Sequence, residues 1–240
     1  MQDNHHIFLP GGSKLFRILR GKVQFTYKNV LVIGSGSEKI AEKIFQAGAK
    51  QVKMIVNDFD SLISSKLNIP SENQIEIKLM EFENTDFTEK EFDLVFAQGS
   101  ISSPNRNKIV REIKRILNAE GIICVGEITA LAKAYPAFIK DIFEASDILP
   151  LHHEEAAKYY EERGFEVLHQ QDLTSSLKSF YENAVKELNQ HLEDLSGKEK
   201  SYYKKELNKI SHESNAYLNL GADKFIGYKM LILKLFNSAS

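Results

Sequence analysis

The residues best placed to do chemistry in this chain form a glycine-containing turn near the amino end. The apolar run 30–33 leads into Gly34, Ser35 and Gly36, and a helix-like segment, 38–47, follows at once. Glycine lets the backbone turn sharply and leaves room for a ligand to lie against it. The helix that follows points free N–H groups and the positive end of its dipole toward the same place. This pattern predicts a binding site for a ligand with a polar or anionic end.

An acidic residue follows the next apolar run. Residues 52–56 read as a second buried strand, and Asn57 and Asp58 come directly after it. A carboxylate at this position can accept hydrogen bonds from the two hydroxyl groups of a ribose. Together, the turn and the carboxylate predict a nucleoside-ligand site at the carboxyl ends of parallel strands.

The dinucleotide-binding fingerprint is incomplete in this turn. The fingerprint requires a third glycine or an alanine three residues after Gly36, and that position is Lys39. A dehydrogenase would also need a second domain for its substrate, for which 240 residues leave little room. A nicotinamide-dependent oxidoreductase is therefore disfavoured, although it stays an alternative.

The elements that position these residues alternate between strand and helix. The expected strands are 30–33, 52–56, 75–79, 92–97, 122–125, 165–168 and 226–235; the main helices are 38–47, 62–67, 107–117, 135–145 and 156–163. Glu120 and Gly121 are expected to form a turn that ends the helix at 107–117. This order predicts a doubly wound α/β fold, a seven-stranded and mostly parallel sheet with helices on both faces.

These segments resemble, in order, the motifs of the class I S-adenosylmethionine-dependent methyltransferases. The resemblance covers residues 9 to 127 and resumes at 159 to 235. Its motifs are the run 30–36, Asp58, Glu81 in the segment 79–87, the fourth-strand segment 92–100, the helix, turn and strand over 109–127, the helix and strand over 159–167, and the last strand, 227–234. The resemblance implies a Rossmann-like fold with an antiparallel last strand and a methyl transfer from S-adenosylmethionine to a small molecule.

The resemblance also implies which residues hold the cofactor. Gly34, Ser35 and Gly36 would bind its methionine end, and Asp58 its ribose. The other implied cofactor contacts are Gly11 and Gly12 in a Pro-Gly-Gly lead-in, Phe59, Glu81 and Phe82 beside the adenine, and Gln98 and Gly99 beside the sulfonium. The chain departs from the family pattern at two positions, where Val32 replaces an acidic residue and Glu38 a glycine. Glu38 is either an ordinary first-turn residue or one that repels the carboxylate of the cofactor, and a non-catalytic, methyltransferase-like binding protein is therefore a second alternative.

Methyl transfer needs no obligatory catalytic residue, because the sulfonium already activates the methyl carbon. A general base helps only when the acceptor must lose a proton, and the candidates are His152, His153 and Glu127. Adjacent histidines on a helix point in different directions, so we expect the His152–Glu155 segment to begin a helix and predict no metal site.

Composition limits the class of partner and the setting. A formal net charge of −2 gives no field that attracts nucleic acid, and no apolar stretch is long enough to span a bilayer. The single cysteine, Cys124, excludes an internal disulfide framework and fits a reducing compartment, so we expect a cytoplasmic protein.

We expect one domain over residues 1–240, with a lead-in or lid at 1–28 and a helical insertion at 175–220 between the last two strands. An apolar stripe through Tyr181, Val185 and Leu188 favours packing of the insertion on its own domain and leaves a homodimer open.

Overall fold

The fold is built on one twisted sheet. The computed structural model describes residues 9–69, 74–194 and 204–236. Its strands are β1 (Asn29–Ile33), β2 (Gln51–Val56), β3 (Glu76–Leu79), β4 (Phe92–Gln98), β5 (Leu117–Ala130), β6 (Leu151–His152), β7 (Phe165–Asp172) and β8 (Ile226–Leu235). They lie in the order β3-β2-β1-β4-β5-β8-β7, with β6 paired to the end of β5. Strand β8 runs antiparallel to both β5 and β7, and the other pairings are parallel.

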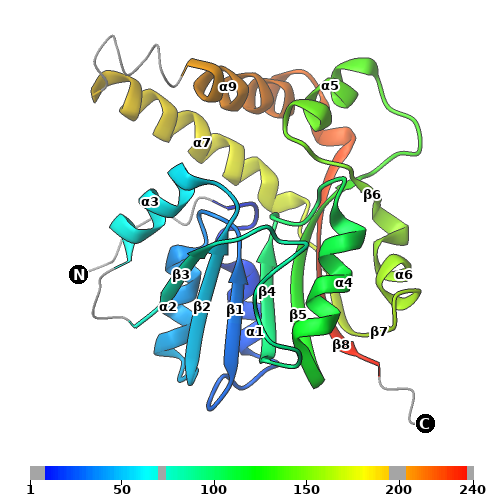
Figure 1. Ribbon diagram of the computed structural model, residues 1–240. Coiled ribbons are helices and arrows are strands. Elements are labelled where there is room, and N and C mark those ends of the chain that lie inside the picture. The colour runs from blue at the N-terminus through cyan, green and yellow to red at the C-terminus, as the bar shows by residue number, and fades with distance from the viewer. Residues whose placement is uncertain (1–8, 70–73, 195–203, 237–240) are drawn as a thin grey trace.

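Helices cover both faces of this sheet and also the carboxyl ends of its central strands (Figure 1). The α-helices are α1 (Lys14–Arg20), α2 (Glu38–Gln46), α3 (Phe59–Asn68), α4 (Arg106–Ile116), α5 (Ala137–Ala145), α6 (Ala156–Glu161), α7 (Ser175–Asp194) and α9 (Lys204–Asn219). Short 3-10 turns, η2 (His153–Glu155) and η3 (Ala222–Lys224), precede α6 and β8. Helices α5, α7 and α9 lie above the carboxyl ends of the central strands.

The alternation of side chains along the strands divides the core between the two faces. Val30 and Val32 of β1 belong to the cluster that α1 and α2 cover, whereas Leu31 and Ile33 belong to the cluster that α4 and α6 cover. All four side chains are at most 1% exposed. A strand buried on both faces reads as a continuous apolar run, which is why β1 was recognisable in the sequence.

The expected fold class is confirmed, with small differences in the strands. All seven expected strands are present, and the two-residue strand β6 is an addition. Glu120 and Gly121, where a turn was expected, are part of β5 instead, and the pairing of β5 with β4 shifts between Phe92 and Leu94. Asn118 fixes this bulged segment because its Nδ2 donates to Oδ1 of Asp93 at 2.5 Å.

The segments outside the central sheet differ more from expectation. Residues 14–20 form α1, a helix that was not predicted, and its Leu15 and Leu19 are fully buried against the sheet. This part of the lead-in is therefore a packed layer. The insertion consists of α7 and α9, and the stacked rings of Tyr181 and Tyr217 join them with centroids 4.4 Å apart.

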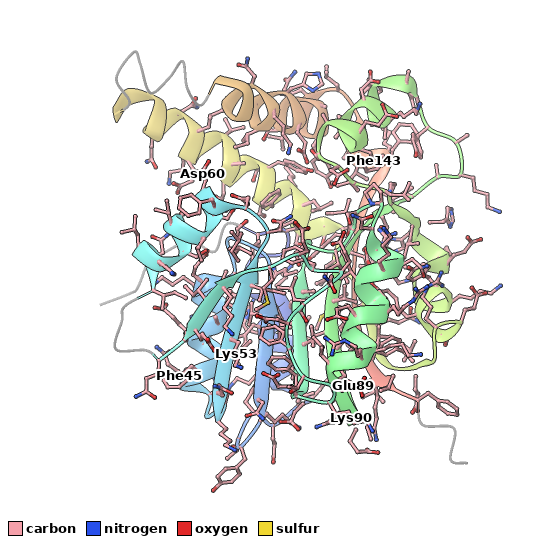
Figure 2. The ribbon with its side chains drawn as sticks, in the orientation of Figure 1. Phe45, Lys53, Asp60, Glu89, Lys90 and Phe143 are labelled. Carbon is pink, nitrogen blue, oxygen red and sulfur yellow. The ribbon has the colours of Figure 1, made fainter. Side chains whose placement is uncertain are left out.

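The two ends of the sheet differ in their surroundings. Figure 2 shows Phe143 of α5 near the carboxyl ends of the strands, and Glu89 and Lys90, just before β4, near the opposite ends. Phe143 is buried, at 2% exposure, and its ring meets Tyr135 edge-on at 5.5 Å between centroids. The carboxyl edge is thus the covered end of the sheet, where ligands of open α/β sheets bind.

Candidate functional site

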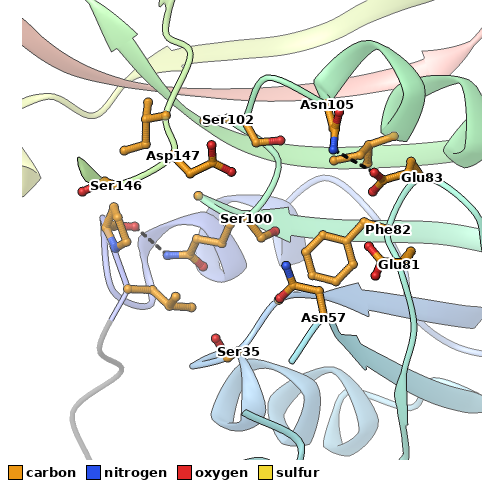
Figure 3. A pocket seen from close by; sticks show the side chains of 18 residues that line it. Ser35, Asn57, Glu81, Phe82, Glu83, Ser100, Ser102, Asn105, Ser146 and Asp147 are labelled. Atoms are coloured by element: carbon orange, nitrogen blue, oxygen red, sulfur yellow. Dashed lines mark hydrogen bonds between the residues drawn. The ribbon is translucent and has the colours of Figure 1, made fainter. Parts of the chain in front are cut away.

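A cavity of about 390 Å³ opens at the carboxyl ends of β1, β2 and β4 (Figure 3). Six of the residues predicted to bind a ligand line it: Gly34, Ser35, Glu81, Phe82, Gln98 and Gly99. The predicted residues Gly11, Gly12, Gly36, Asp58 and Phe59 are not among its lining residues. Segments far apart in the chain close it, since Leu9 and Pro10 come from the lead-in and Ser146, Asp147 and Ile148 from the loop after α5.

Gly34 occupies a position that only glycine fits. Its φ is +105°, in a region that L side chains rarely adopt. A Cβ added there would lie 2.5 Å from Cβ of Ser100. Ser100 is held in place because its Oγ donates to the carbonyl of Ile33 at 2.6 Å. Glycine is therefore required at this position for the backbone to pack against Ser100, and Gly34 itself lines the cavity.

Glu38 braces the glycine turn through its side-chain carboxylate. Its Oε1 accepts hydrogen bonds from the N–H of Gly36, at 3.2 Å, and from Oγ of Ser65 on α3, at 2.5 Å. The residue is 8% exposed and does not line the cavity. Its carboxylate thus takes one of the N–H groups of the turn and ties the turn to α3.

Gln98 anchors the lead-in across the cavity. Its Nε2 donates to the carbonyl oxygens of Pro10, at 2.7 Å, and Gly12, at 2.8 Å. Gly12 itself donates to the carbonyl of Leu9 at 2.8 Å, which closes a turn. Gln98 is 1% exposed, and its Oε1 has no donor among the described residues. A buried acceptor without a partner is unusual and is satisfied when a ligand brings a donor.

Asn57, and not Asp58, stands in the wall of the cavity. Asp58 is the N-cap of α3, and its Oδ1 accepts a hydrogen bond from the N–H of Ser61 at 2.7 Å. The neighbouring Phe59 is 63% exposed. The helix starts so soon after β2 that the first polar residue faces the cavity and the second caps the helix.

Glu127 lies behind the cavity wall, fully buried on β5. Its carboxylate accepts hydrogen bonds from Oγ of Ser102 at 2.6 Å, from Nε of Arg106 at 3.1 Å, and from the hydroxyl of Tyr160. Burial, followed by the charge of Glu127, raises the pKa of Tyr160 well above its usual value, so the phenol stays protonated and donates.

The same network holds the loop that covers the cavity. Arg106 donates from Nη2 to the carbonyl of Leu149 at 2.6 Å, and the N–H of Leu149 donates to the carbonyl of Ser102 at 2.9 Å. Ser102 is in the cavity wall, and Leu149 directly follows the lining residues Ser146 to Ile148. The geometry gives Glu127 and Arg106 a positioning role rather than contact with a ligand.

Comparison with known proteins agrees with this arrangement. Residues 31–125 match a family model described as a methyltransferase domain. The chain has the fold of a class I methyltransferase. The predicted resemblance is thereby confirmed. No curated protein matches the sequence at a significant level.

Solved structures similar to this methyltransferase fold have low sequence identity to the chain. A putative sarcosine dimethylglycine methyltransferase from Galdieria sulphuraria superposes with a TM-score of 0.76 at 14% identity, covering 92% of this chain and 82% of that one. A phosphoethanolamine N-methyltransferase 2 from Haemonchus contortus, in complex with S-adenosylhomocysteine, gives 0.76 at 15% identity, covering 95% of this chain and 54% of that one. The cyclase SpnF gives 0.74 at 17% identity, covering 92% and 79%. These likenesses show the fold, and the reaction has to be argued from the site.

The two candidate histidines, His152 and His153, lie outside this cavity. His152 ends β6, and the buried His153 begins the turn η2. His153 lines a second hollow of about 480 Å³ beside β7 and β8, together with Asp172 and Lys229. Its Nδ1 lies 2.8 Å from Oγ1 of Thr129, and its Nε2 lies 3.7 Å from Oδ2 of Asp172. No group of three or more potential metal ligands occurs among the residues that the structure describes.

Burial lowers the pKa of His153, while Asp172 acts in the opposite direction. When the pH falls through about 6.5, the imidazole of His153 is protonated in the unfolded chain but stays neutral in the folded protein. We expect the free energy of unfolding to fall as the pH is lowered from about 7 toward 5. Urea titrations across this range should show that the free energy of unfolding depends less on pH in His153→Gln than in the parent. His212→Gln, on the exposed face of α9, should behave like the parent. Equal slopes in the parent and His153→Gln would contradict this assignment.

Several cavity residues were missed by the sequence reasoning. They are Asn57, Glu83, Ser100, Ser102, Asn105 and Asp147. Asn57 could have been found, because it is the first polar residue after β2. Asp147 carries no local signal, since its place depends on the loop after α5 folding back over β4 and β5.

No helix in the described part of the chain has the length and apolar character needed to cross a membrane.

Proposed function

We propose that this protein is an S-adenosylmethionine-dependent methyltransferase that transfers a methyl group to a small-molecule acceptor by in-line displacement. The observation that carries the proposal is the cavity at the carboxyl ends of β1, β2 and β4, which is lined by Gly34 of the glycine turn and by Gln98, whose Oε1 has no partner among the described residues. The match of residues 31–125 to a methyltransferase domain supports it.

The cavity fits the cofactor in size and in chemistry. Its volume of about 390 Å³ lies within the range that small-molecule sites occupy. The ammonium of the methionine end can donate to Oε1 of Gln98, which otherwise lacks a donor. Phe82, 7% exposed, offers an apolar face to a purine, and Glu81 beside it offers an acceptor.

Each part of the cavity has a proposed task. S-adenosylmethionine, when bound, supplies a methyl carbon that the sulfonium has already activated. The backbone of Gly34 and Ser35 holds the methionine end, Asn57 binds the ribose, and Glu81 and Phe82 flank the adenine. The lead-in at Pro10 and the loop 146–148 exclude water, so that the chain contributes mainly orientation and desolvation.

The rival interpretation is a non-catalytic relative or one with another reaction. It is favoured by Glu38, which already occupies the N–H of Gly36, and by a fold that also carries a protein described as a cyclase. Incubation with methyl-labelled S-adenosylmethionine and a panel of small molecules separates the two. Label in a small-molecule product supports methyl transfer; tight binding of S-adenosylhomocysteine without any labelled product supports the rival.

Binding of S-adenosylhomocysteine should stabilise the fold measurably. At a hundred times its dissociation constant it should add about 2.7 kcal/mol to the free energy of unfolding. Asn57→Ala should lose most of this stabilisation, because the side chain in the cavity wall is removed. Asp58→Ser should keep it, because serine still caps α3. Thermal-shift titrations measure both. If Asp58→Ser loses the stabilisation and Asn57→Ala keeps it, the ribose contact is Asp58. NAD serves as the control ligand in the same titrations.

The setting and the partners are also proposals. We infer action on a small molecule in the cytoplasm, with no nucleic acid or membrane as partner, from the net charge of −2 and the single, buried Cys124. A homodimer through α7 and α9 is the untested alternative to the intramolecular packing of these helices, and light scattering after size exclusion would decide it.

A further inference from the structure

Glu38 places a negative charge of the protein's own at the amino end of α2. Helix amino ends attract anions, because their first N–H groups lack partners and the helix dipole is positive there. Glu38 is the first residue of α2, and its Oε1 accepts hydrogen bonds from the N–H of Gly36, at 3.2 Å, and from Oγ of Ser65, at 2.5 Å. The side chain is buried. The carboxylate of a ligand would therefore meet a resident carboxylate at this turn.

No cation of the described residues compensates this charge. Lys39, the next residue in the chain, directs its Nζ to Oε2 of Glu42 at 2.8 Å, one turn further along α2. The lining of the cavity, within the described ranges, contains no lysine, arginine or histidine. A negative charge on a ligand at the turn is thus repelled by Glu38 and has no cation in the wall to pair with.

The backbone donors around the turn are already engaged. The N–H of Gly34 donates to the carbonyl of Ile55 at 2.9 Å, and the N–H of Gly99 donates to the carbonyl of Gly126 at 2.9 Å. The N–H of Gly36 is bound by the carboxylate described above. These three glycines therefore have no free N–H group to offer to an anion.

The side chains between the turn and the lead-in offer an acceptor instead of a donor. Nε2 of Gln98 donates to the carbonyls of Pro10 and Gly12, and Oγ of Ser100 donates to the carbonyl of Ile33. Oε1 of Gln98 is buried and has no donor among the described residues. These groups suit the ammonium of an amino acid and provide no hydrogen-bond donor for its carboxylate.

We propose that Glu38 is a specificity-determining residue, which keeps the α-carboxylate of the cofactor from binding at the glycine turn. The inference rests on the proposed function and specifies how its cofactor is recognised. The adenosine and the ammonium of the ligand supply the binding free energy, and the carboxylate supplies none. An adenosyl ligand that lacks the α-carboxylate should therefore bind at least as tightly as S-adenosylhomocysteine.

The test compares two ligands that differ only in this carboxylate. S-adenosylhomocysteine and its decarboxylated analogue, 5′-(3-aminopropylthio)-5′-deoxyadenosine, are each titrated into the protein by isothermal calorimetry. The measured quantity is the ratio of their dissociation constants, in which the contributions of the adenosine and the ammonium largely cancel. We expect the parent to bind the analogue as tightly as S-adenosylhomocysteine or more tightly.

Two variants locate the effect at Glu38. Glu38→Gln keeps an acceptor for Gly36 and Ser65, so it should fold, and we expect it to shift the ratio about fivefold in favour of S-adenosylhomocysteine. Glu38→Ala also frees the N–H of Gly36 and should shift the ratio about tenfold or more in the same direction. Glu42→Gln removes the other buried carboxylate of α2 and is the matched control, which should leave the ratio unchanged.

The outcomes separate this role of Glu38 from the proposed function. If both ligands bind and S-adenosylhomocysteine binds the parent more tightly than the analogue, the role is wrong and the proposed function stands. The same holds if the ratio is equal in the parent and in both Glu38 variants. If neither ligand binds the parent or any variant, the proposed function fails and the role of Glu38 fails with it. Binding of S-adenosylhomocysteine by the Glu38 variants alone supports the role.

Discussion

Glu127→Ala is expected to lower the free energy of unfolding by about 3–5 kcal/mol, because it leaves the buried guanidinium of Arg106 without its counter-charge. Ser102 and Tyr160 lose their acceptor in the same step. Urea titration at pH 7 measures the effect. Glu155→Ala, at an exposed position just before α6, is the matched control and should stay within about 0.5 kcal/mol of the parent.

Two further variants distinguish positioning from catalysis at this residue. Glu127→Leu combined with Arg106→Met replaces the ion pair by apolar groups and should recover part of the lost stability. Glu127→Gln keeps the shape of the side chain, and we expect lower stability together with weaker binding in the cavity, because the loop 146–149 loses its anchor. Full stability with no methyl transfer in Glu127→Gln would make Glu127 a general base and contradict the positioning role.

Gly34→Ala is the second change with a large expected effect. The positive φ costs roughly 1–3 kcal/mol for a residue with a side chain. The new Cβ would also lie 2.5 Å from Cβ of Ser100, so the floor of the cavity must shift. We expect loss of stability and at least a hundredfold weaker binding of S-adenosylhomocysteine, measured by isothermal titration.

The contributions of strain and collision can be separated. Gly48 has a similar φ of +98°, and a Cβ there would meet its neighbour Thr26 only at 3.6 Å. Gly48→Ala should therefore cost stability without affecting ligand binding. Adding Ser100→Gly to Gly34→Ala removes the collision and should restore part of the affinity. Unchanged binding in Gly34→Ala would show that the ligand does not lie on this turn.

The parts of the site that follow directly from a strand could be predicted from the sequence. Strand β1 is buried on both faces, so its apolar run and the glycines after it are read within ten residues. The same holds for Gln98 and Gly99 at the end of β4. The positions of these residues could be predicted from the local sequence alone, because ligands of open α/β sheets bind at the carboxyl ends of the parallel strands.

The remainder depends on contacts between distant segments. Glu127 looked like a candidate base because it ends an apolar run, but the donors that engage it come from Ser102, Arg106 and Tyr160, 21 to 33 residues away. Asp147 had no signal, because its position depends on a loop held by Leu149 and Ser146. Whether Asp58 or Asn57 faces the cavity is decided by the first residue of α3, and helix boundaries are the least predictable feature of a sequence.

The location of the cofactor is tested most directly by a crystal structure grown with saturating S-adenosylhomocysteine. Our account predicts that the ligand lies in the cavity at the ends of β1, β2 and β4, with its amino acid end over Gly34 and within hydrogen-bond distance of Gln98, and its adenine against Phe82. An empty cavity at that concentration, or S-adenosylhomocysteine bound elsewhere on the protein, would contradict it.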